Sequence, residues 1–211
     1  FLLCKDTNFS EFIVSLQRFF TNYYMESTLI DSALEALRLG KTLLYPTDTI
    51  WGIGCDATRS DVVERIYKIK ERDHTKSMLV LANEKMLSPD LPHNVWTLLN
   101  SSQPTTVILP ISMLSIPIAD NLPASDNTIG IRIPNFDFCK NLLDALGHPI
   151  VSTSANLSGK PSPEKYEDIS DDIKMRVDLA LPDDKSFHHN NNRGSRIVKI
   201  DTFGNITVLR P

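Results

Sequence analysis

The chain has 211 residues, of which 41% are hydrophobic and 23% charged, a composition typical of a folded globular protein that excludes a fibrous or disordered one. It carries 26 acidic and 22 basic residues, which gives a formal net charge of −4. It therefore lacks the broad cationic surface of a nonspecific nucleic-acid binder, and any contact with RNA would have to be local.

Residues 1–24 precede a methionine, Met25, after which the sequence pattern becomes regular. Residues 9–20 predict an amphipathic helix that begins at Ser10. This helix is too short and too interrupted by charge to cross a membrane, and no apolar core ends in the small-residue cleavage site of a signal peptide. We expect residues 1–24 to be an extension without catalytic function and residues 25–211 to form a single domain without a membrane segment.

Helix and strand patterns alternate after this extension. A helix is predicted from Thr28 to the stop signal Gly40, and a strand follows over Thr42–Tyr45. Pro46 ends that strand and starts a polar loop, and a glycine-punctuated run over Trp51–Gly54 comes next.

The remainder of the chain keeps the same alternation. Ser60 predicts the N-cap of a helix that ends near Lys70. Strands are expected over Met78–Ala82, Thr106–Leu109, Ile129–Ile133, Ile150–Ser152, Arg196–Ile200 and Ile206–Leu209, and helices around 91–100, 136–146 and 164–175. The alternation indicates an α/β (α+β) domain whose twisted mixed sheet is flanked by helices. Segments 161–163 and 182–194 are candidate mobile loops.

The cysteine and histidine spacing is not that of a metal site or a disulfide framework. Cys4, Cys55 and Cys139 are widely separated and form no Cys-x-x-Cys pair. His188 and His189 lie in an asparagine-rich run that is typical of a solvated loop. We therefore expect no protein-bound metal and a reducing, cytoplasmic setting.

Three familiar motifs are incomplete in this sequence. Residues 40–42 (Gly-Lys-Thr) resemble the end of a phosphate-binding P-loop, but the glycine that the motif requires at position 35 is Glu35. Residues 52–57 fit a dinucleotide fingerprint, but a polar loop separates them from the strand, and no acidic residue ends a strand about twenty positions later. The absence of a Gly-x-Ser-x-Gly elbow favours chemistry by positioning and charge neutralisation over a covalent serine nucleophile.

A cluster of small polar side chains, Ser152–Asn156, directly follows a short apolar strand. Ligands of open α/β sheets lie beyond the carboxyl ends of strands, so these groups are expected to face a site where a carboxylate or phosphate can approach the backbone. Taken alone, the run is also typical of a polar turn that satisfies its own backbone.

Lys70 and Arg72 belong to a basic cluster with Lys68 and Lys76 at the end of a predicted helix. Arginine offers a planar fork and lysine a point charge, a combination that can hold a triphosphate. Positive residues at a helix C-terminus are also favoured by the helix dipole and by solvation, so the cluster by itself does not identify a ligand.

Four runs taken together resemble the YrdC-like threonylcarbamoyl-AMP synthase family. They are Leu44–Ala57, the Lys70-x-Arg72 pair, Thr128–Pro134 and Ser152–Gly159, and they occur in the family's order. The resemblance implies the short, single-domain form of the family, with a central, concave, positively charged cavity on a twisted α/β sheet.

The same resemblance implies roles for individual residues. Lys70 and Arg72 would be catalytic, and L-threonine would be held by Thr49, Arg132, Ser152 and Ser195. ATP would be surrounded by Arg72, Lys76, Thr128, Ser154, Asn156, Ser162 and Arg210. Mg²⁺ would arrive with ATP, because no carboxylate cage is visible in the sequence.

The activity implied by the resemblance is the synthesis of L-threonylcarbamoyladenylate. The amine of L-threonine and bicarbonate would form a carbamate, whose oxygen would attack the α-phosphate of ATP and expel pyrophosphate. A downstream tRNA-modifying transferase complex would use the product to make threonylcarbamoyladenosine (t6A) in tRNA. The alternative is a paralogue of the same fold that acts mainly as an RNA- or nucleotide-binding protein, with a weak contact to tRNA through a local patch.

Overall fold

The computed structural model describes residues 13–14, 27–183, 193–201 and 205–211. The expectations for the extension 1–24 and for the helix over 9–20 lie outside these residues, apart from Ile13 and Val14, which are helical and exposed. Most of the loop 182–194, which the sequence marks as a candidate mobile segment, also lies outside them.

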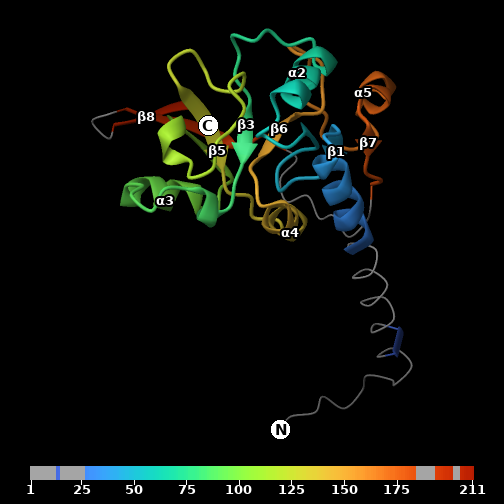
Figure 1. Cartoon of the computed structure of the whole chain (residues 1–211), viewed down its shortest axis with the longest axis horizontal. Coiled ribbons are helices and arrows are strands. Elements are labelled where there is room, and N and C mark those ends of the chain that lie inside the picture. Colours follow the sequence, from blue (N-terminus) through green and yellow to red (C-terminus); the bar gives the residue numbers. More distant parts are fainter. Residues whose placement is uncertain (1–12, 15–26, 184–192, 202–204) are drawn as a thin grey trace.

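The described strands form a nine-stranded mixed sheet in the order β7-β1-β2-β6-β3-β5-β4-β8-β9 (Figure 1). The strands are β1 (Leu43–Tyr45), β2 (Gly52–Gly54), β3 (Leu79–Leu81), β4 (Thr105–Pro110), β5 (Thr128–Arg132), β6 (Ile150–Ser154), β7 (Leu179–Ala180), β8 (Arg196–Ile200) and β9 (Ile206–Arg210). The prediction of an α/β domain built on a mixed sheet is confirmed.

Strand β6 joins the two halves of this sheet. On one side it pairs antiparallel with β2, with Ser154 opposite Gly52, and on the other it pairs antiparallel with β3, with Ser152 opposite Leu79. The glycine-punctuated run is therefore a strand, which the sequence pattern did not predict. Gly54 is required there, because a Cβ on it would lie 2.3 Å from the carbonyl oxygen of Val151.

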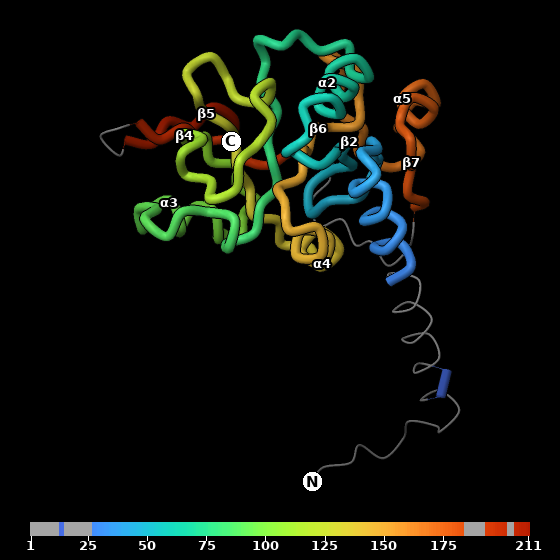
Figure 2. The backbone as a smooth tube through the Cα atoms, viewed as in Figure 1, coloured from blue at the N-terminus to red at the C-terminus, as the bar shows by residue number. Residues whose placement is uncertain are grey.

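Helices pack around the sheet (Figure 2). They are a helix over 27–38, α2 (Ser60–Ile69), α3 (His93–Leu99), α4 (Asp137–Leu146) and α5 (Asp171–Arg176). The helix over 27–38 lies beside α4, where the Arg38 guanidinium donates to the carbonyl oxygen of Ala145 at 3.1 Å. At the other end of the sheet, α3 packs beside β4.

Gly40 ends the helix over 27–38 as predicted. Its φ of +69° lies in the left-handed region that favours glycine. Gly40 N–H donates to the carbonyl oxygen of Leu37 and Lys41 N–H to that of Ala36, both at 2.9 Å, which together form a Schellman cap. The glycine therefore serves helix termination, which agrees with the rejection of a P-loop at this position.

Two predicted helix starts are wrong. α2 begins at Ser60, but its N-cap is Arg59, which makes no side-chain cap hydrogen bond, so Ser60 is not the cap. The helix expected over 164–175 begins only at Asp171, after Ser170, whose hydroxyl accepts from Ile173 N–H at 3.4 Å. Residues 164–169 form turns instead, in which Asp168 N–H donates to the carbonyl oxygen of Lys165 at 3.2 Å and Ile169 N–H to that of Tyr166 at 3.1 Å.

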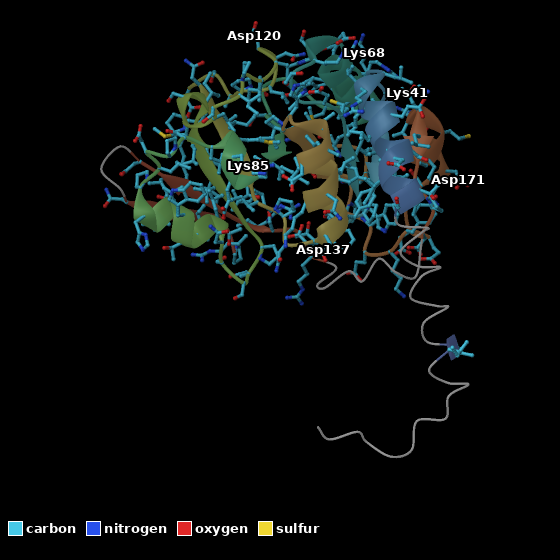
Figure 3. The ribbon with its side chains drawn as sticks, turned by 60° about the horizontal axis from the view of Figure 1, so that its bottom comes forward. Lys41, Lys68, Lys85, Asp120, Asp137 and Asp171 are labelled. Carbon is cyan, nitrogen blue, oxygen red and sulfur yellow. The ribbon has the colours of Figure 1, made fainter. Side chains whose placement is uncertain are left out.

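Burial separates an apolar core from a charged surface. α2 turns Val62, Val63 and Ile66 inward, each at most 1% exposed, and burial of such a side chain contributes roughly 1.5–3 kcal/mol. Lys68 and Asp137, labelled in Figure 3, lie outside, with side chains 74% and 86% exposed. Among the described residues, no helix has the length and apolar character needed to cross a membrane.

Candidate active site

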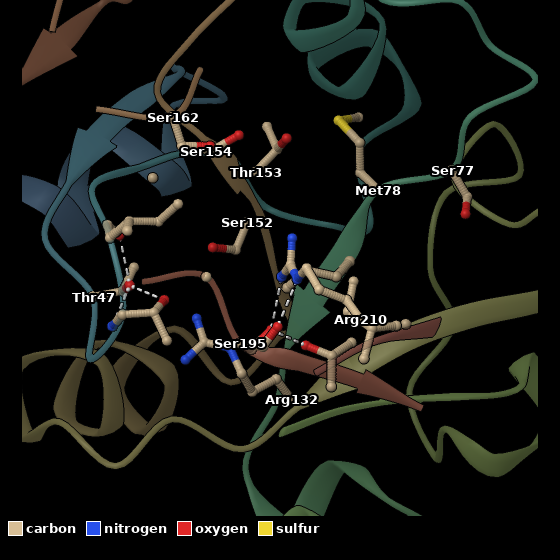
Figure 4. Close-up of a pocket in the computed structure, with 18 of the residues that line it drawn as sticks. Thr47, Ser77, Met78, Arg132, Ser152, Thr153, Ser154, Ser162, Ser195 and Arg210 are labelled. Atoms are coloured by element: carbon tan, nitrogen blue, oxygen red, sulfur yellow. Dashed lines mark hydrogen bonds between the residues drawn. The ribbon is translucent and has the colours of Figure 1, made fainter. Parts of the chain in front are cut away.

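A cavity of about 240 Å³ lies over the sheet, and strands from both halves contribute to its wall (Figure 4). It brings together many of the predicted site residues, namely Thr49, Arg72, Arg132, Ser152, Ser154, Ser162, Ser195 and Arg210. Among the described residues, the lining contains arginines and hydroxyl groups but neither aspartate nor glutamate. Such a wall suits an anionic ligand.

Arg132, at the end of β5, is fixed by a buried ion pair. Arg132 is 2% exposed and Asp48 4%, and the Arg132 Nη1 donates to Oδ1 of Asp48. The other Asp48 oxygen accepts from Asn135 N–H at 3.2 Å. Within the described part of the chain, Nε of Arg132 has no hydrogen-bond partner. A buried N–H without a partner is costly, and this one has almost no accessible surface.

The hydroxyl of Thr49 has a defined hydrogen-bonding polarity. Thr47 Oγ1 gives its one proton to the carbonyl oxygen of Ile50 at 2.7 Å. It must therefore accept from Thr49 Oγ1, at 2.9 Å, while it also accepts from Thr49 N–H at 3.1 Å. The Thr49 hydroxyl has then used its proton, and only its lone pairs remain for a group in the cavity.

Ser195, immediately before β8, is held by β4 and β9. Its hydroxyl lies 2.7 Å from that of Thr106, and the Arg210 Nε donates to its carbonyl oxygen at 2.8 Å. Burial lowers the pKa of Arg210, and the nearby positive charge of Arg132 lowers it further. The guanidinium groups of Arg132 and Arg210 thus both line the cavity, and Arg132 is paired with the Asp48 carboxylate behind the wall.

Arg72 lies in the cavity wall next to the loop that leads into β3. Its Nε donates to the carbonyl oxygen of Lys76 at 2.9 Å, and its Nη2 donates to that of Ser77 at 2.8 Å. Burial lowers the pKa of Arg72. Two loop carbonyls thus fix one edge of the guanidinium, and its remaining N–H groups are suited to an anion in the cavity.

Lys70 does not line the cavity, although the sequence marks it as a catalytic candidate. It is 1% exposed, and its ammonium donates to the carbonyl oxygen of Ser154, to that of Asn156 at 2.6 Å and to the Asn156 side-chain oxygen at 3.5 Å. Burial lowers its pKa to about 7, with a further contribution from the charge of Arg72.

Three residues predicted to contact ATP also lie outside the lining. Lys76 is exposed, and Tyr67 and Arg72 contact only its carbonyl oxygen. The Thr128 hydroxyl donates to Asp126 at 2.6 Å. The side-chain amide of Asn156 donates to the carbonyl oxygen of Lys160 at 2.6 Å. The structure therefore brings together part of the predicted nucleotide-binding set.

Three positioning residues did not emerge from the sequence. Asp48 orients Arg132, Thr47 sets the polarity of Thr49, and Thr106 contacts Ser195. Asp48 and Thr47 belong to the polar loop after the first strand, a signal that could have identified them. Thr106 carries only a weak signal, since a hydroxyl in a strand is common.

The described residues contain no group of three or more His, Cys, Asp or Glu side chains that could hold a metal ion. His148 lies 2.9 Å from the Asp56 carboxylate, outside the cavity wall. The donor set of the cavity therefore fits a divalent cation only if another molecule supplies most of its ligands.

Comparison with known proteins gives one family match and several relatives. The family Sua5_yciO_yrdC, described as "Telomere recombination", matches residues 35–211. A threonylcarbamoyl-AMP synthase of Bacillus subtilis (strain 168) is 30% identical over 152 residues, which cover 70% of this chain and 44% of that protein. The chain thus spans less than half the length of this relative.

Two solved structures share the fold. P. abyssi Sua5 complexed with L-threonine has a TM-score of 0.70 and 24% identity, covering 86% of this chain and 53% of that one. E. coli YciO has a TM-score of 0.68 and 25% identity, covering 87% of this chain and 88% of that one. The described domain therefore corresponds to nearly the whole of the shorter structure.

Proposed function

We propose that this chain is a nucleotidyltransferase that makes L-threonylcarbamoyladenylate and pyrophosphate from L-threonine, bicarbonate and ATP. The starting point is that the chain belongs to the Sua5_yciO_yrdC family. The observation that carries this proposal is the buried guanidinium of Arg132, which shares one cavity with Thr49, Arg72 and Arg210. In this proposal an amino acid would lie beside Arg132 and Thr49, and phosphates would lie beside Arg72 and Arg210.

L-Threonine would bind between Arg132 and Thr49. The fork of Arg132, already oriented by Asp48, suits the substrate carboxylate. Thr49 Oγ1 can only accept, so it suits a donor such as the substrate amine. Ser152 and Ser195 would complete this side. The Sua5 structure with bound L-threonine supports the choice of amino acid, since it has the same fold.

ATP would bind toward Arg72, Ser154, Ser162 and Arg210. Arginine neutralises phosphate charge, and serine hydroxyls add hydrogen bonds without blocking the approach of the nucleotide. The lining offers no carboxylate, so Mg²⁺ would enter as part of the substrate MgATP, held by phosphate oxygens. Lys76, Thr128 and Asn156 would reach the nucleotide only if their side chains left their present positions.

The reaction would depend on positioning. The amine of threonine attacks bicarbonate and water leaves, which gives the carbamate. A carbamate oxygen then attacks the α-phosphorus of ATP as the bond to pyrophosphate breaks. Alignment of two bound reactants can lower a barrier by about 7–11 kcal/mol, so a cavity without a nucleophile is sufficient for this chemistry. Arg72 would offset charge that grows on the phosphates in the transition state.

The product would be consumed by a tRNA-modifying transferase complex that makes t6A, and the setting of this chemistry would be cytoplasmic. A mixed anhydride of a carbamate and AMP hydrolyses readily in water, so rapid transfer to an acceptor would be advantageous. These assignments follow from the family and from the chemistry of the product.

The decisive experiment is mass detection of threonylcarbamoyladenylate after mixing the purified chain with MgATP, bicarbonate and L-threonine. We expect product that requires all of these components. Arg132→Lys retains the charge beside Asp48 but loses the fork, so it should raise KM for threonine at least about tenfold. An unchanged threonine dependence in this variant would refute the substrate orientation.

A second candidate function is that of a paralogue that mainly binds nucleotide or RNA. It is favoured by the match to YciO, which covers 88% of that chain, and by the positions of Lys76 and Thr128 outside the cavity wall. Retention of tRNA in a filter-binding assay, together with no threonine-dependent release of pyrophosphate, would support this function over synthesis.

A further inference from the structure

Lys70 occupies an unusual place for a residue of a phosphate-binding motif. It is the C-cap residue of α2 and lies two positions before Arg72, yet its side chain points into the protein and not into the cavity that Arg72 lines. Its side chain is among the largest fully buried ones in the described part of the chain. A buried cation requires compensation by partners.

The partners of Lys70 are oxygens from the end of β6. An ammonium has three N–H donors, and three acceptors surround this one: the carbonyl oxygens of Ser154 and Asn156 and the Asn156 side-chain oxygen. The three donors therefore already have acceptors within the chain. A phosphate could recruit this ammonium only by breaking bonds that hold the β6 end in place.

The main chain of Lys70 contacts the same segment. Its carbonyl oxygen accepts from Ser158 N–H at 2.8 Å. Lys70 thus contacts residues 154–158 through both its ammonium group and its main-chain carbonyl oxygen. These contacts connect the C-terminus of α2 to the turn after β6. Ser154, whose carbonyl it holds, lines the cavity with its neighbours Ser152 and Thr153.

We propose that Lys70 is a positioning residue, not a phosphate ligand: its ammonium holds the carbonyls of the segment 154–156 so that the hydroxyl of Ser154 faces the cavity. This proposal rests on the proposed function for the identity of the nucleotide, but its structural content does not depend on turnover. The two members of the Lys-x-Arg pair would then have different roles. Arg72 would contact the nucleotide in the cavity, and Lys70 would hold the part of the cavity wall that contains Ser154.

Deprotonation would weaken this contact but not remove it. Burial lowers the pKa of Lys70 to about 7, and Arg72 is the charged group that acts on it in addition. A neutral amine still has two N–H groups, which suffice for the two carbonyl oxygens. Only the longer contact to the Asn156 side chain, at 3.5 Å, would then lack a donor.

The test is amide hydrogen exchange of the free protein, without nucleotide, in Lys70→Met and in a matched Lys68→Met control. Lys68 lies on the same helix with a side chain 74% exposed. We expect exchange in the peptide over 154–160 to rise at least tenfold in Lys70→Met and to stay unchanged in Lys68→Met. Ala155 N–H and Ser158 N–H, which bond to Trp51 and Lys70 carbonyl oxygens, are the amides that report it.

The opposite outcome has a clear form. If exchange over 154–160 stayed at the wild-type rate in Lys70→Met while the Kd for MgATP rose tenfold, Lys70 would be a phosphate ligand and the proposal would be wrong. A failure of the proposed function would give a different result. The wild-type protein would then make no threonylcarbamoyladenylate, regardless of the amide exchange rates over 154–160.

Acylation of the wild-type protein keeps the proposal testable if Lys70→Met does not fold. Lysines are modified with an N-hydroxysuccinimide acetate and counted by peptide mass spectrometry, with and without saturating MgATP. We expect Lys70 to be at least tenfold less reactive than Lys68 in both conditions. A reactive Lys70 that MgATP protects would overturn the assignment.

Discussion

The two ends of the cavity are built differently. At the Arg132 end, polar side chains hold one another, as in the Arg132–Asp48 pair and the Thr106–Ser195 contact, and these groups are at most 5% exposed. At the Arg72 end, cationic side chains hold backbone carbonyl oxygens of loops. Under the proposed function, the first end would couple ligand recognition to the stability of the core, whereas the second would couple it to the order of the two segments that Arg72 and Lys70 hold.

The largest expected effect tests the first end. Asp48→Ala leaves the Arg132 guanidinium buried without its partner, and breaking a buried pair in this way costs about 3–5 kcal/mol. Urea unfolding should show this loss. Asp137→Ala is the control, because its side chain is 86% exposed and its place in the first turn of α4 contributes only about 0.3–1 kcal/mol. If Asp48→Ala and Asp137→Ala lowered the free energy of unfolding by similar amounts, the Arg132 end of the cavity would not be coupled to the stability of the core.

Arg72→Ala tests the second end. Adenylate formation should fall at least about tenfold, because the lost contact strengthens as phosphate charge grows in the transition state. The fold should remain intact, since within the described residues the hydrogen bonds of the Arg72 side chain go to the loop carbonyls of Lys76 and Ser77. The measurement is kcat/KM for ATP with a parallel thermal melt. Wild-type turnover would exclude Arg72 from the reaction.

The pH dependence of stability separates Lys70 from its neighbours. Its pKa is about 7 in the folded chain and 10.5 in the ordinary state, so the unfolded chain binds more protons between these values. Stability should therefore rise with pH above 7, by at most about 1.4 kcal/mol per pH unit. Lys70→Met should lack this rise in unfolding free energies measured from pH 6.5 to 8.5. An equal rise in Lys70→Met would assign the effect to another group.

The smallest effect is expected from Ser154→Ala. A single neutral hydroxyl contributes about 0.5–1.5 kcal/mol, so KM for ATP should rise roughly two- to tenfold with stability unchanged. Lys70 holds the carbonyl oxygen of Ser154, and the substitution does not remove that contact. A loss as large as that of Arg72→Ala would instead give Ser154 a role in the chemical step.

Local signals in the sequence predicted much of the fold. Gly40 was recognised as a helix stop because the Schellman cap depends on neighbouring residues alone. The apolar face of α2 follows from helical spacing. The helix expected over 164–175 was too long because residues 165–169 close short turns and Ser170 caps the helix only after them, and propensity does not reveal which of several possible starts the chain uses.

The site was harder to predict because its contacts join distant parts of the chain. Arg132 was identified as a site residue, but its partner Asp48 lies 84 positions earlier. Lys70 likewise bonds to Ser154 across 84 positions, so a motif that contains only Lys70 and Arg72 cannot show that the two side chains point in different directions. The resemblance to a family supplied residue types, and the sheet supplied their orientation.

The pairing of β6 has a consequence for the order in which the chain acquires its structure. β1 and β2 are close in sequence and can pair as soon as both are synthesised, but the other edge of β2 has no partner until residues 150–154 have been synthesised. β3 also needs β6 on one side and β5 on the other. Contacts of such long sequence separation form slowly, and an open strand edge is prone to association. We therefore expect folding to be slow and sensitive to protein concentration until β6 closes the gap between the two half-sheets.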